Sequence, residues 1–241
     1  MMESLHDKET PFFLQRIRQT INEKIHFIYN DKMGTSIQLG LPSHISSKQA
    51  VDLYFQAFGK KERHLTLFSN DEQTMKNYLE HSMNWNAVLF ATHENELLGM
   101  CGIQKGMNPG PFSTQIAPLI AHFQIWGGWW RWILRWLQRT IDSWKEDVLH
   151  IEFLVVNPDV RNQGWGSKLL DSAEDEARKQ GCKALGLEVI DTNPRAKSLY
   201  QRKGFQTIQH YSTQWLTRRA GFSSLEKMQK PLQPQRKRYS R

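Results

Sequence analysis

The segment Arg161-Asn-Gln-Gly-Trp-Gly166 has the residue types and spacing of a phosphate-binding turn. It follows an apolar run, Leu149–Val156, that is typical of a buried strand, and it precedes a helical pattern over Ser167–Gln180. A turn from a strand into a helix exposes the unpaired N–H groups at the positive end of the helix. The two glycines let a phosphate approach the backbone, and the arginine adds a positive charge with bidentate geometry.

Two other phosphate-binding motifs do not fit this segment. A Walker A loop needs Gly-x-x-x-x-Gly-Lys followed by Ser or Thr, which is absent. A Rossmann fingerprint needs a third glycine at the position where this chain has Leu169. The alternative that involves no ligand is an ordinary tight turn containing two glycines.

The same segment resembles the pyrophosphate loop of the GNAT superfamily of acyl-CoA N-acyltransferases, in which Arg or Gln is followed by x-x-Gly-x-Gly or x-x-Gly-x-Ala. Leu154–Pro158 is similar to the Val-x-Pro strand exit of that family. Asn193–Phe205 resembles its second motif, Asn-x-x-Ala-x-x-Leu-Tyr-x-x-x-Gly-Phe. The close resemblance covers Leu149–Gln209, whereas Thr35–Gln104 fits the family only loosely.

The resemblance implies that the chain binds acetyl-CoA as a co-substrate. Backbone N–H groups of the turn would bind the pyrophosphate, and main-chain groups of Leu154 and Val156 would pair with the pantetheine arm like an added strand. Trp165 departs from the family pattern, which has a smaller aliphatic residue there; the backbone contacts should survive. The expected acetyl-CoA-binding residues are Leu154, Val155, Val156, Arg161, Asn162, Gln163, Gly164, Trp165, Gly166, Ser167, Asn193 and Tyr200.

Three residues are candidates for proton transfer. The resemblance implies that Tyr200 protonates the departing thiolate, and its ordinary pKa of about 10 lies above a thiol pKa of about 8.5. Glu188 matches a position that serves as the base in some protein-acetylating members. Glu152 lies inside an apolar strand pattern, and burial there would raise its pKa toward neutrality, as suits a base. His150 is expected at an edge or on the surface. We expect no metal.

The periodicity of the chain predicts alternating strands and helices, and the resemblance implies an α/β fold. This fold is a GNAT-like mixed, twisted sheet of about seven strands, splayed between the central strand and the next, with helices on both faces. We expect a helical N-terminal extension over residues 1–34, a GNAT domain over 35–229 with a helical insertion at about 112–146, and a basic tail over 230–241. The expected strands are 35–41, 85–92, 97–104, 149–156, 184–189, 205–209 and 224–229. The expected helices of the domain begin at Ser46 or Ser47, Asp71, Ser167 and Pro194 and end at Phe58, His81, Gln180 and Arg202.

The expected insertion is rich in tryptophan. On a helical wheel Arg131 and Arg135 fall on one side, while the Trp residues occupy a wide apolar arc. Three interpretations remain open: a helix packed on the domain, a homodimer interface, or contact with a membrane surface or hydrophobic acceptor. Six of the nine Trp residues lie in this segment: Trp126, Trp129, Trp130, Trp132, Trp136 and Trp144.

The net charge of +8 comes mostly from the end of the chain. Residues 230–241 hold five basic and no acidic side chains, so the rest of the chain is close to neutral, which disfavours nucleic-acid binding as the main task. A composition of 39% hydrophobic and 23% charged residues excludes a disordered or collagen-like chain. Cys101 and Cys182 have neither metal-ligand nor redox spacing, and residues 106–130 are too polar for a membrane span. These features predict a cytoplasmic protein with reduced thiols.

These expectations combine into one function. The resemblance implies an N-acetyltransferase that transfers an acetyl group from acetyl-CoA to a primary amine of an unidentified acceptor. Direct attack in a ternary complex is favoured, because neither cysteine lies in the motifs. The alternative is a non-catalytic acyl-CoA-binding sensor or interaction module on the same fold, which would keep the turn without needing Tyr200.

Overall fold

The computed structural model describes residues 34–66, 69–112, 115–141, 144–212 and 217–232, and these residues form one seven-stranded sheet. The strand order is β1-β2-β3-β4-β5-β7-β6, and neighbours are antiparallel except for β4 and β5. The predicted mixed sheet is confirmed. The strands are β1 (Thr35–Leu39), β2 (Val88–His93), β3 (Glu96–Lys105), β4 (Val148–Val156), β5 (Ala184–Ile190), β6 (Gln206–Ser212) and β7 (Ser224–Pro231).

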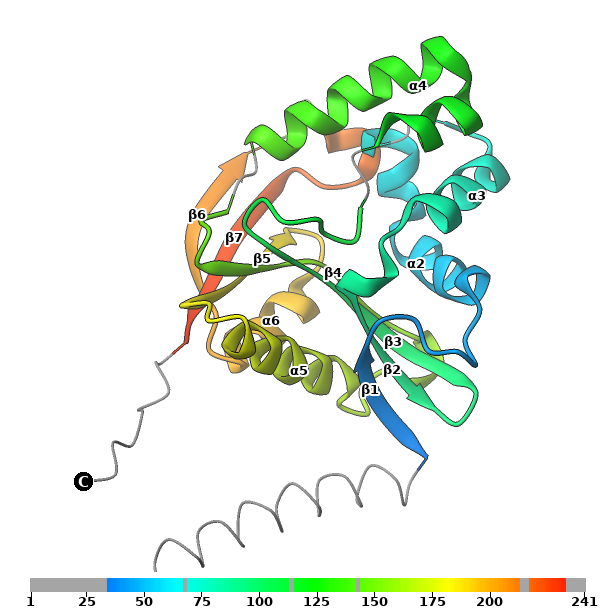
Figure 1. Cartoon of the computed structure of the whole chain (residues 1–241). Helices are drawn as coiled ribbons and strands as arrows, with labels where there is room; N and C mark the ends of the chain where they lie inside the picture. The colour runs from blue at the N-terminus through cyan, green and yellow to red at the C-terminus, as the bar shows by residue number, and fades with distance from the viewer. Residues whose placement is uncertain (1–33, 67–68, 113–114, 142–143, 213–216, 233–241) are drawn as a thin grey trace, which may run out of the picture.

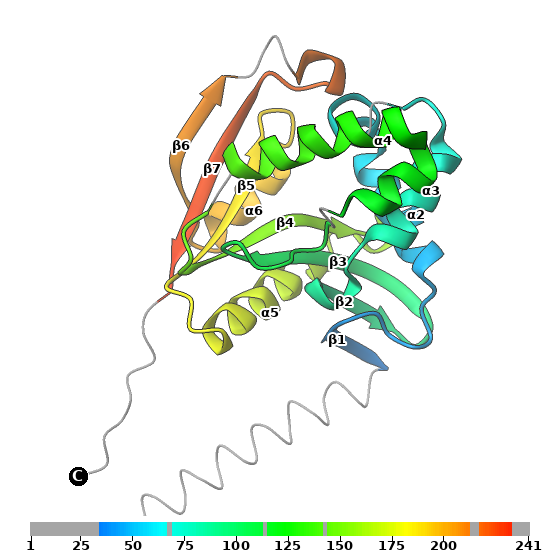
Figure 2. The same ribbon diagram turned by 45° about the horizontal axis from the view of Figure 1, so that its top comes forward.

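Helices cover both faces of the sheet, as predicted. Figures 1 and 2 show α5 and α6 on one face and α2, α3 and α4 on the other. The local sequence explains several boundaries: Ser46 and Gln49 form a capping box before α2, and Asn193 caps α6 ahead of Pro194. The helices are α2 (Ser47–Lys61), α3 (Glu72–Ser82), α4 (Ile116–Ile141), α5 (Trp165–Lys179) and α6 (Pro194–Arg202). Short helical turns are η1 (Glu62–Thr66), η2 (Trp85–Ala87), η3 (Pro158–Val160) and η4 (Arg218–Ala220).

Two hydrophobic clusters hold these layers together, one on each face of the sheet. The first joins α5 and α6 to β4 and β5 and includes Ile151 and Leu187. The second joins α2 and α3 to β3 and β4 and includes Tyr54 and Phe153. Burying a large apolar side chain stabilises a fold by about 1.5–3 kcal/mol, so both clusters fix the position of β4.

Strand β4 contains a β-bulge, which changes the residues that face each cluster. Its pairing with β3 moves from Gly102↔Phe153 to Ile103↔Ile151, so Glu152 stands opposite no residue of β3. An extra residue in one strand reverses the alternation of side chains beyond it. Ile151 therefore packs toward α5, whereas Phe153 packs toward α2 and α3.

The sheet splays immediately after this bulge. Strands β4 and β5 pair from Val148↔Ala184 only as far as Ile151↔Leu187. Beyond that pair, β4 continues to Val156 along β3, while β5 continues to Ile190 along β7. The predicted opening between the central strand and the next is confirmed, and it begins at Glu152.

Helix α4 is divided by a kink. The backbone of Gln124 has φ 62° and ψ 171°, which is not helical. The two parts of the helix approach each other closely at Gly128, where a Cβ would lie 2.6 Å from the backbone nitrogen of Ile120. This contact covers the side of the second part that faces the first.

The close approach overturns part of the helical-wheel prediction. Arg131, expected on the polar side, is buried; its Nη1 donates to the carbonyl oxygen of Gly127 at 2.9 Å, and its guanidinium lies 4.4 Å from the centre of the Phe123 ring. Trp129, expected on the apolar side, is 49% exposed, and Trp126 at the start of this part of the helix is 81% exposed. The homodimer and membrane-surface interpretations of this segment stay predictions.

The ends of the predicted domain differ in how much the structure describes. The expected N-terminal extension lies almost wholly outside the described residues, as does most of the expected tail. Strand β7 reaches Pro231 and Leu232 is buried, so the sheet includes the first residues assigned to the tail. Among the described residues, none of the helices combines the length and the hydropathy needed to cross a membrane.

Candidate active site

The predicted phosphate-binding turn leads into the N-terminus of α5. Gly164 is the N-cap residue with φ 86°, and no side chain caps the helix there. The backbone N–H of Lys168 donates to the carbonyl oxygen of Gly164 at 3.0 Å, which begins the intrahelical bonds. The N–H groups of the three residues Trp165, Gly166 and Ser167 precede that bond and stand at the positive end of the helix. This arrangement suits an anion.

Glycine is required at the two positions of the turn, Gly164 and Gly166, for different structural reasons. A Cβ on Gly164 would meet no atom within 4 Å, so the space outside this position is open and the positive φ is what demands glycine. A Cβ on Gly166 would lie 3.2 Å from Cδ2 of Leu199. Gly166 therefore allows close packing of α5 against α6, a reason that differs from the expected approach of a phosphate.

Two other side chains of the turn contact the rest of the protein, while Asn162 and Gln163 are exposed. The Nε of Arg161 donates to the carbonyl oxygen of Val156 at 3.3 Å, next to the opening of the sheet. Trp165 is 9% exposed and belongs to the cluster under α5, and Nζ of Lys168 lies 4.0 Å from the centre of its ring. Because the Trp165 side chain is buried, only its backbone is available to a ligand bound at the turn. That the backbone contacts survive this departure from the family pattern stays a prediction.

The exposed edge of β4 leads directly to this turn. Leu154 pairs with Cys101 and Val156 with Gly99 on the β3 side, but the pairing with β5 has already ended. The predicted residues Leu154, Val155 and Val156 therefore border the opening, where an extended ligand can add to the edge of the strand. The strand edge and the uncapped helix end form one continuous surface for a long, phosphate-bearing ligand.

Tyr200 and Asn193 come from α6, on the other side of the opening. Tyr200 is 7% exposed and belongs to the hydrophobic cluster under α5. Burial, with a smaller contribution from the neighbouring Cys101 thiol, raises the pKa of Tyr200, so the phenol stays protonated at neutral pH. The Oδ1 of Asn193 accepts a hydrogen bond from the N–H of Ala196 at 3.2 Å, so this side chain caps α6.

The structure brings the two predicted bases, Glu152 and Glu188, to one place. Each lies one residue beyond the last β4–β5 pair, Ile151↔Leu187. Leu187 and Val189 pack toward α5, so Glu188 projects from the opposite face of its strand. Glu152 projects from that same face, as its contact with His150 shows. Both carboxylates are half-buried at the start of the opening.

The prediction that His150 lies at an edge or on the surface is wrong. It is 9% exposed, because its ring stacks on Trp144 with centroids 4.8 Å apart and planes 24° apart. Its Nδ1 lies 3.2 Å from Oε1 of Glu152. Trp144 in turn packs over Gly186 and lies beyond the end of α4, so it is not part of the Trp-rich helix. The available sequence signal was a histidine two residues before a glutamate in an apolar strand.

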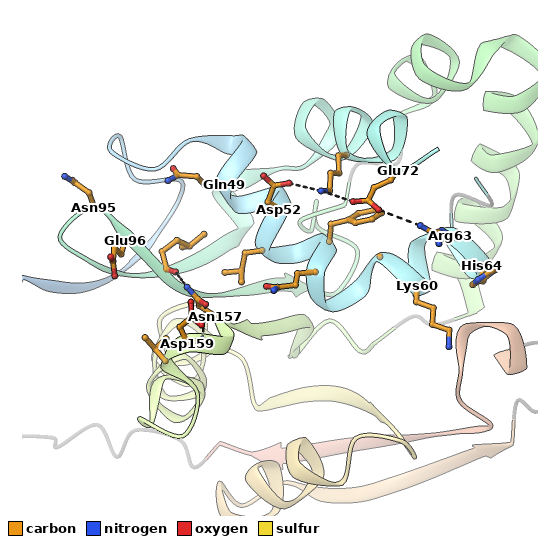
Figure 3. Close-up of a pocket in the computed structure, with 17 residues that line it drawn as sticks. Gln49, Asp52, Lys60, Arg63, His64, Glu72, Asn95, Glu96, Asn157 and Asp159 are labelled. Carbon is orange, nitrogen blue, oxygen red and sulfur yellow. Dashed lines mark hydrogen bonds and ion pairs between the residues drawn. The ribbon is translucent and has the colours of Figure 1, made fainter. Parts of the chain in front are cut away.

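A groove of about 1220 Å³ opens beside the end of β4, as Figure 3 shows. It runs between α2 and the segment Asn157–Val160, and its walls combine charged side chains with apolar ones such as Leu53 and Phe55. Lys76 bridges Asp52 and Glu72 at 3.0 Å each, and these carboxylates raise the pKa of Lys76. None of the predicted acetyl-CoA-binding residues lines the groove; Asn157 and Asp159, just before the turn, do.

Comparison with known proteins identifies the family to which this chain belongs. The model of the acetyltransferase (GNAT) family matches residues 48–205, so the chain belongs to that family. A thialysine N-epsilon-acetyltransferase of Bos taurus is 38% identical over 69 residues, which are 29% of this chain and 41% of that protein. A ribosomal protein bS18-alanine N-acetyltransferase of Escherichia coli strain K12 is 42% identical over 52 residues, 22% of this chain and 35% of that protein. The matches therefore span less than half the length of these curated relatives.

Solved structures confirm the fold. A GCN5-related N-acetyltransferase from Kribbella flavida superposes with a TM-score of 0.53 at 16% identity, covering 83% of this chain and 98% of that one. A crystal structure of another acetyltransferase gives a TM-score of 0.52 at 20% identity, covering 81% and 98%. The resemblance seen in the two motifs thus extends to the architecture of the whole sheet.

Proposed function

We propose that this chain is an N-acetyltransferase that transfers an acetyl group from acetyl-CoA to a primary amine by direct attack. One observation carries the proposal: the unpaired edge of β4 runs into the uncapped N-terminus of α5, beside Tyr200. A pyrophosphate at the helix end and an extended arm along the strand need those two surfaces in that order.

The donor would be held mostly by backbone groups. The N–H groups of residues 163–167 would bind the pyrophosphate, with Arg161 beside them, and the edge of β4 from Leu154 to Val156 would pair with the pantetheine arm. Asn193 has its Oδ1 engaged as a cap, which leaves its amide NH₂ for the same ligand. A backbone N–H at the start of the opening would polarise the thioester carbonyl.

Direct attack is favoured over an acetylated cysteine intermediate. A nucleophilic cysteine needs its thiolate form. Cys101 is fully buried, and burial raises the pKa of its thiol; burial also raises the pKa of Cys182. The amine nitrogen of the acceptor would form the new bond to the acetyl carbon while the carbon–sulfur bond breaks. Tyr200 would give its proton to the departing thiolate.

The acceptor is proposed as a primary amine because the named relatives act on such groups. Thialysine carries a side-chain amine, and the acceptor named for the bacterial relative is an alanine of a ribosomal protein. Glu152 and Glu188, the two carboxylates expected from the sequence to take part in proton transfer, both lie at the start of the opening. Their negative charges favour an acceptor that arrives as a cation.

Two measurements test this function. Acetyl-CoA should raise the melting temperature of the chain, and a panel containing thialysine, lysine, spermidine and a peptide beginning with alanine should yield a product heavier by one acetyl group. If acetyl-CoA neither binds nor stabilises the protein, the donor assignment is wrong. Binding without acetylation of any panel amine would favour the non-catalytic sensor.

A further inference from the structure

His150 occupies a position that the proposed function does not yet use. It lies on β4 two residues before the bulged Glu152, and Leu149 and Ile151 on either side of it pack toward α5. Its ring therefore projects from the opposite face, together with Glu152 and Glu188. This is the face toward α4, away from the helix whose N-terminus would bind the donor (Figure 2).

The contact with Glu152 fixes the protonation pattern of the neutral ring. An ionised carboxylate only accepts hydrogen bonds, so the 3.2 Å contact requires the proton of the imidazole to be on Nδ1. The neutral ring then carries its lone pair on Nε2. A carboxylate that holds one ring nitrogen as a donor makes the other nitrogen a better proton acceptor.

The Nε2 atom is buried and has no hydrogen-bond partner within the described residues. A buried polar atom is nearly always paired with protein or with water, so an orphaned ring nitrogen points to a ligand or a water at this position. The Nε1 of Trp144, whose ring stacks on His150, is also buried without a partner. The stacked pair of rings thus carries two buried nitrogens without a partner within the described residues.

The surrounding charges are consistent with a cationic acceptor. Glu152 on β4 and Glu188 on β5 supply two carboxylates, and Lys227 on β7 has its Nζ 3.9 Å from the centre of the Trp144 ring. Lys227 is the residue of β7 that pairs with Glu188.

We infer that His150 is the proton acceptor for the attacking amine, and that Glu152 acts through it as a positioning residue. The inference rests on the proposed function and assigns its base. The acceptor ammonium gives one proton to Nε2, which leaves a neutral amine whose nitrogen lone pair forms the bond to the acetyl carbon. Electrons of the carbon–sulfur bond leave with the sulfur, and Tyr200 protonates the thiolate. The second proton lost by the attacking nitrogen, as it becomes the amide, restores the Tyr200 hydroxyl, and the proton on His150 passes to solvent.

The test uses the full chain with acetyl-CoA and the fastest amine of the panel. His150→Ala should lower kcat/KM by about 100- to 10,000-fold, the usual contribution of a positioned base. Its acetyl-CoA affinity should stay within about threefold of the unchanged protein, since the donor surface is on β4 beyond the bulge and on α5. Added imidazole should restore part of the lost rate. His44→Ala, an exposed histidine before α2, is the matched control and should leave kcat/KM unchanged.

Two further readouts separate proton transfer from a structural role. The acid limb of the pH profile of kcat/KM should be present in the His44→Ala control and absent from His150→Ala, and Glu152→Gln should shift that limb. Nitrogen NMR of ¹⁵N-histidine-labelled protein should show one ring, missing in His150→Ala, with its proton on Nδ1 at neutral pH.

The outcomes are distinguishable. Unchanged turnover in His150→Ala, an unaltered pH profile, or a proton on Nε2 would overturn the role of His150 while leaving the transferase proposal intact. If acetyl-CoA fails to bind, or binds without any amine being acetylated, the proposed function fails and the role of His150 fails with it.

Discussion

Gly164 gives the sharpest test of where the donor binds. Its φ of 86° is a conformation that costs an L-residue about 1–2 kcal/mol. A new Cβ would meet no protein atom within 4 Å, so Gly164→Ala adds backbone strain without a clash. The smaller entropy of the unfolded alanine chain offsets about 0.4–1 kcal/mol of that strain. The expected net loss is about 1 kcal/mol, or roughly 2–4 °C in melting temperature for a domain of this size.

Gly181 is a matched control at the other end of the same helix. It has φ 70°, and a Cβ there would also meet nothing within 4 Å. Gly181→Ala should therefore lose about the same stability as Gly164→Ala. Only at Gly164 does the methyl group enter the space in which a pyrophosphate would approach the positive end of α5.

The assay compares melting temperature and acetyl-CoA affinity, by calorimetry, in both variants. Gly164→Ala should weaken binding at least about tenfold, which corresponds to about 1.4 kcal/mol, whereas Gly181→Ala should bind like the unchanged protein. Equal affinity in the two variants would refute the placement of the pyrophosphate at this turn. A stability loss confined to one variant would refute the strain argument.

Three other variants test separate parts of the structure. Tyr200→Phe should lower kcat about 100-fold or more and spare acetyl-CoA binding; unchanged turnover removes Tyr200 from the acid role. Trp165→Ala should destabilise the fold by about 3–5 kcal/mol in urea unfolding, because the ring is buried under α5. The hydrogen bond from Lys197 lowers the pKa of Glu226, so this carboxylate stabilises the fold above its unfolded pKa and loses that effect as pH falls through its folded pKa. Lys197→Met should therefore destabilise the protein at pH 7, and this loss should shrink as the pH falls from 4.5 through the folded pKa of Glu226; a loss of stability that does not change with pH would contradict this linkage.

Features set by neighbouring residues could be predicted from the sequence. Helix α6 has the predicted bounds because Asn193 and Pro194 together specify a cap and a first turn. The turn at Gly164 was predicted because glycine is the residue that adopts its backbone conformation without strain. Glu152 and Glu188 were predicted as candidates, and the structure places both at the same end of the β4–β5 pairing.

Features set by tertiary contacts could not be predicted in this way. Helix α4 is kinked at Gln124, a residue with a side chain that nevertheless has a positive φ. The sequence around Gln124 contains no turn signal that would predict this kink. It folds the start of α4 against Gly128, which buries Arg131 and leaves Trp129 exposed. The burial of His150 likewise depends on Trp144, a residue that the helical periodicity assigned to a different element.

The bulge at Glu152 links the two halves of the candidate site. If the side chains of β4 alternated regularly through Glu152, Leu154 and Val156 would project toward α2 instead of packing against the cluster under α5. The bulge also coincides with the end of the β4–β5 pairing, which exposes the strand edge for the donor. On the near side of the bulge, His150 and Glu152 share the face toward α4. A single irregularity in one strand therefore places the donor surface and the proposed base on opposite sides of the same residue, as attack by an amine on a bound thioester requires.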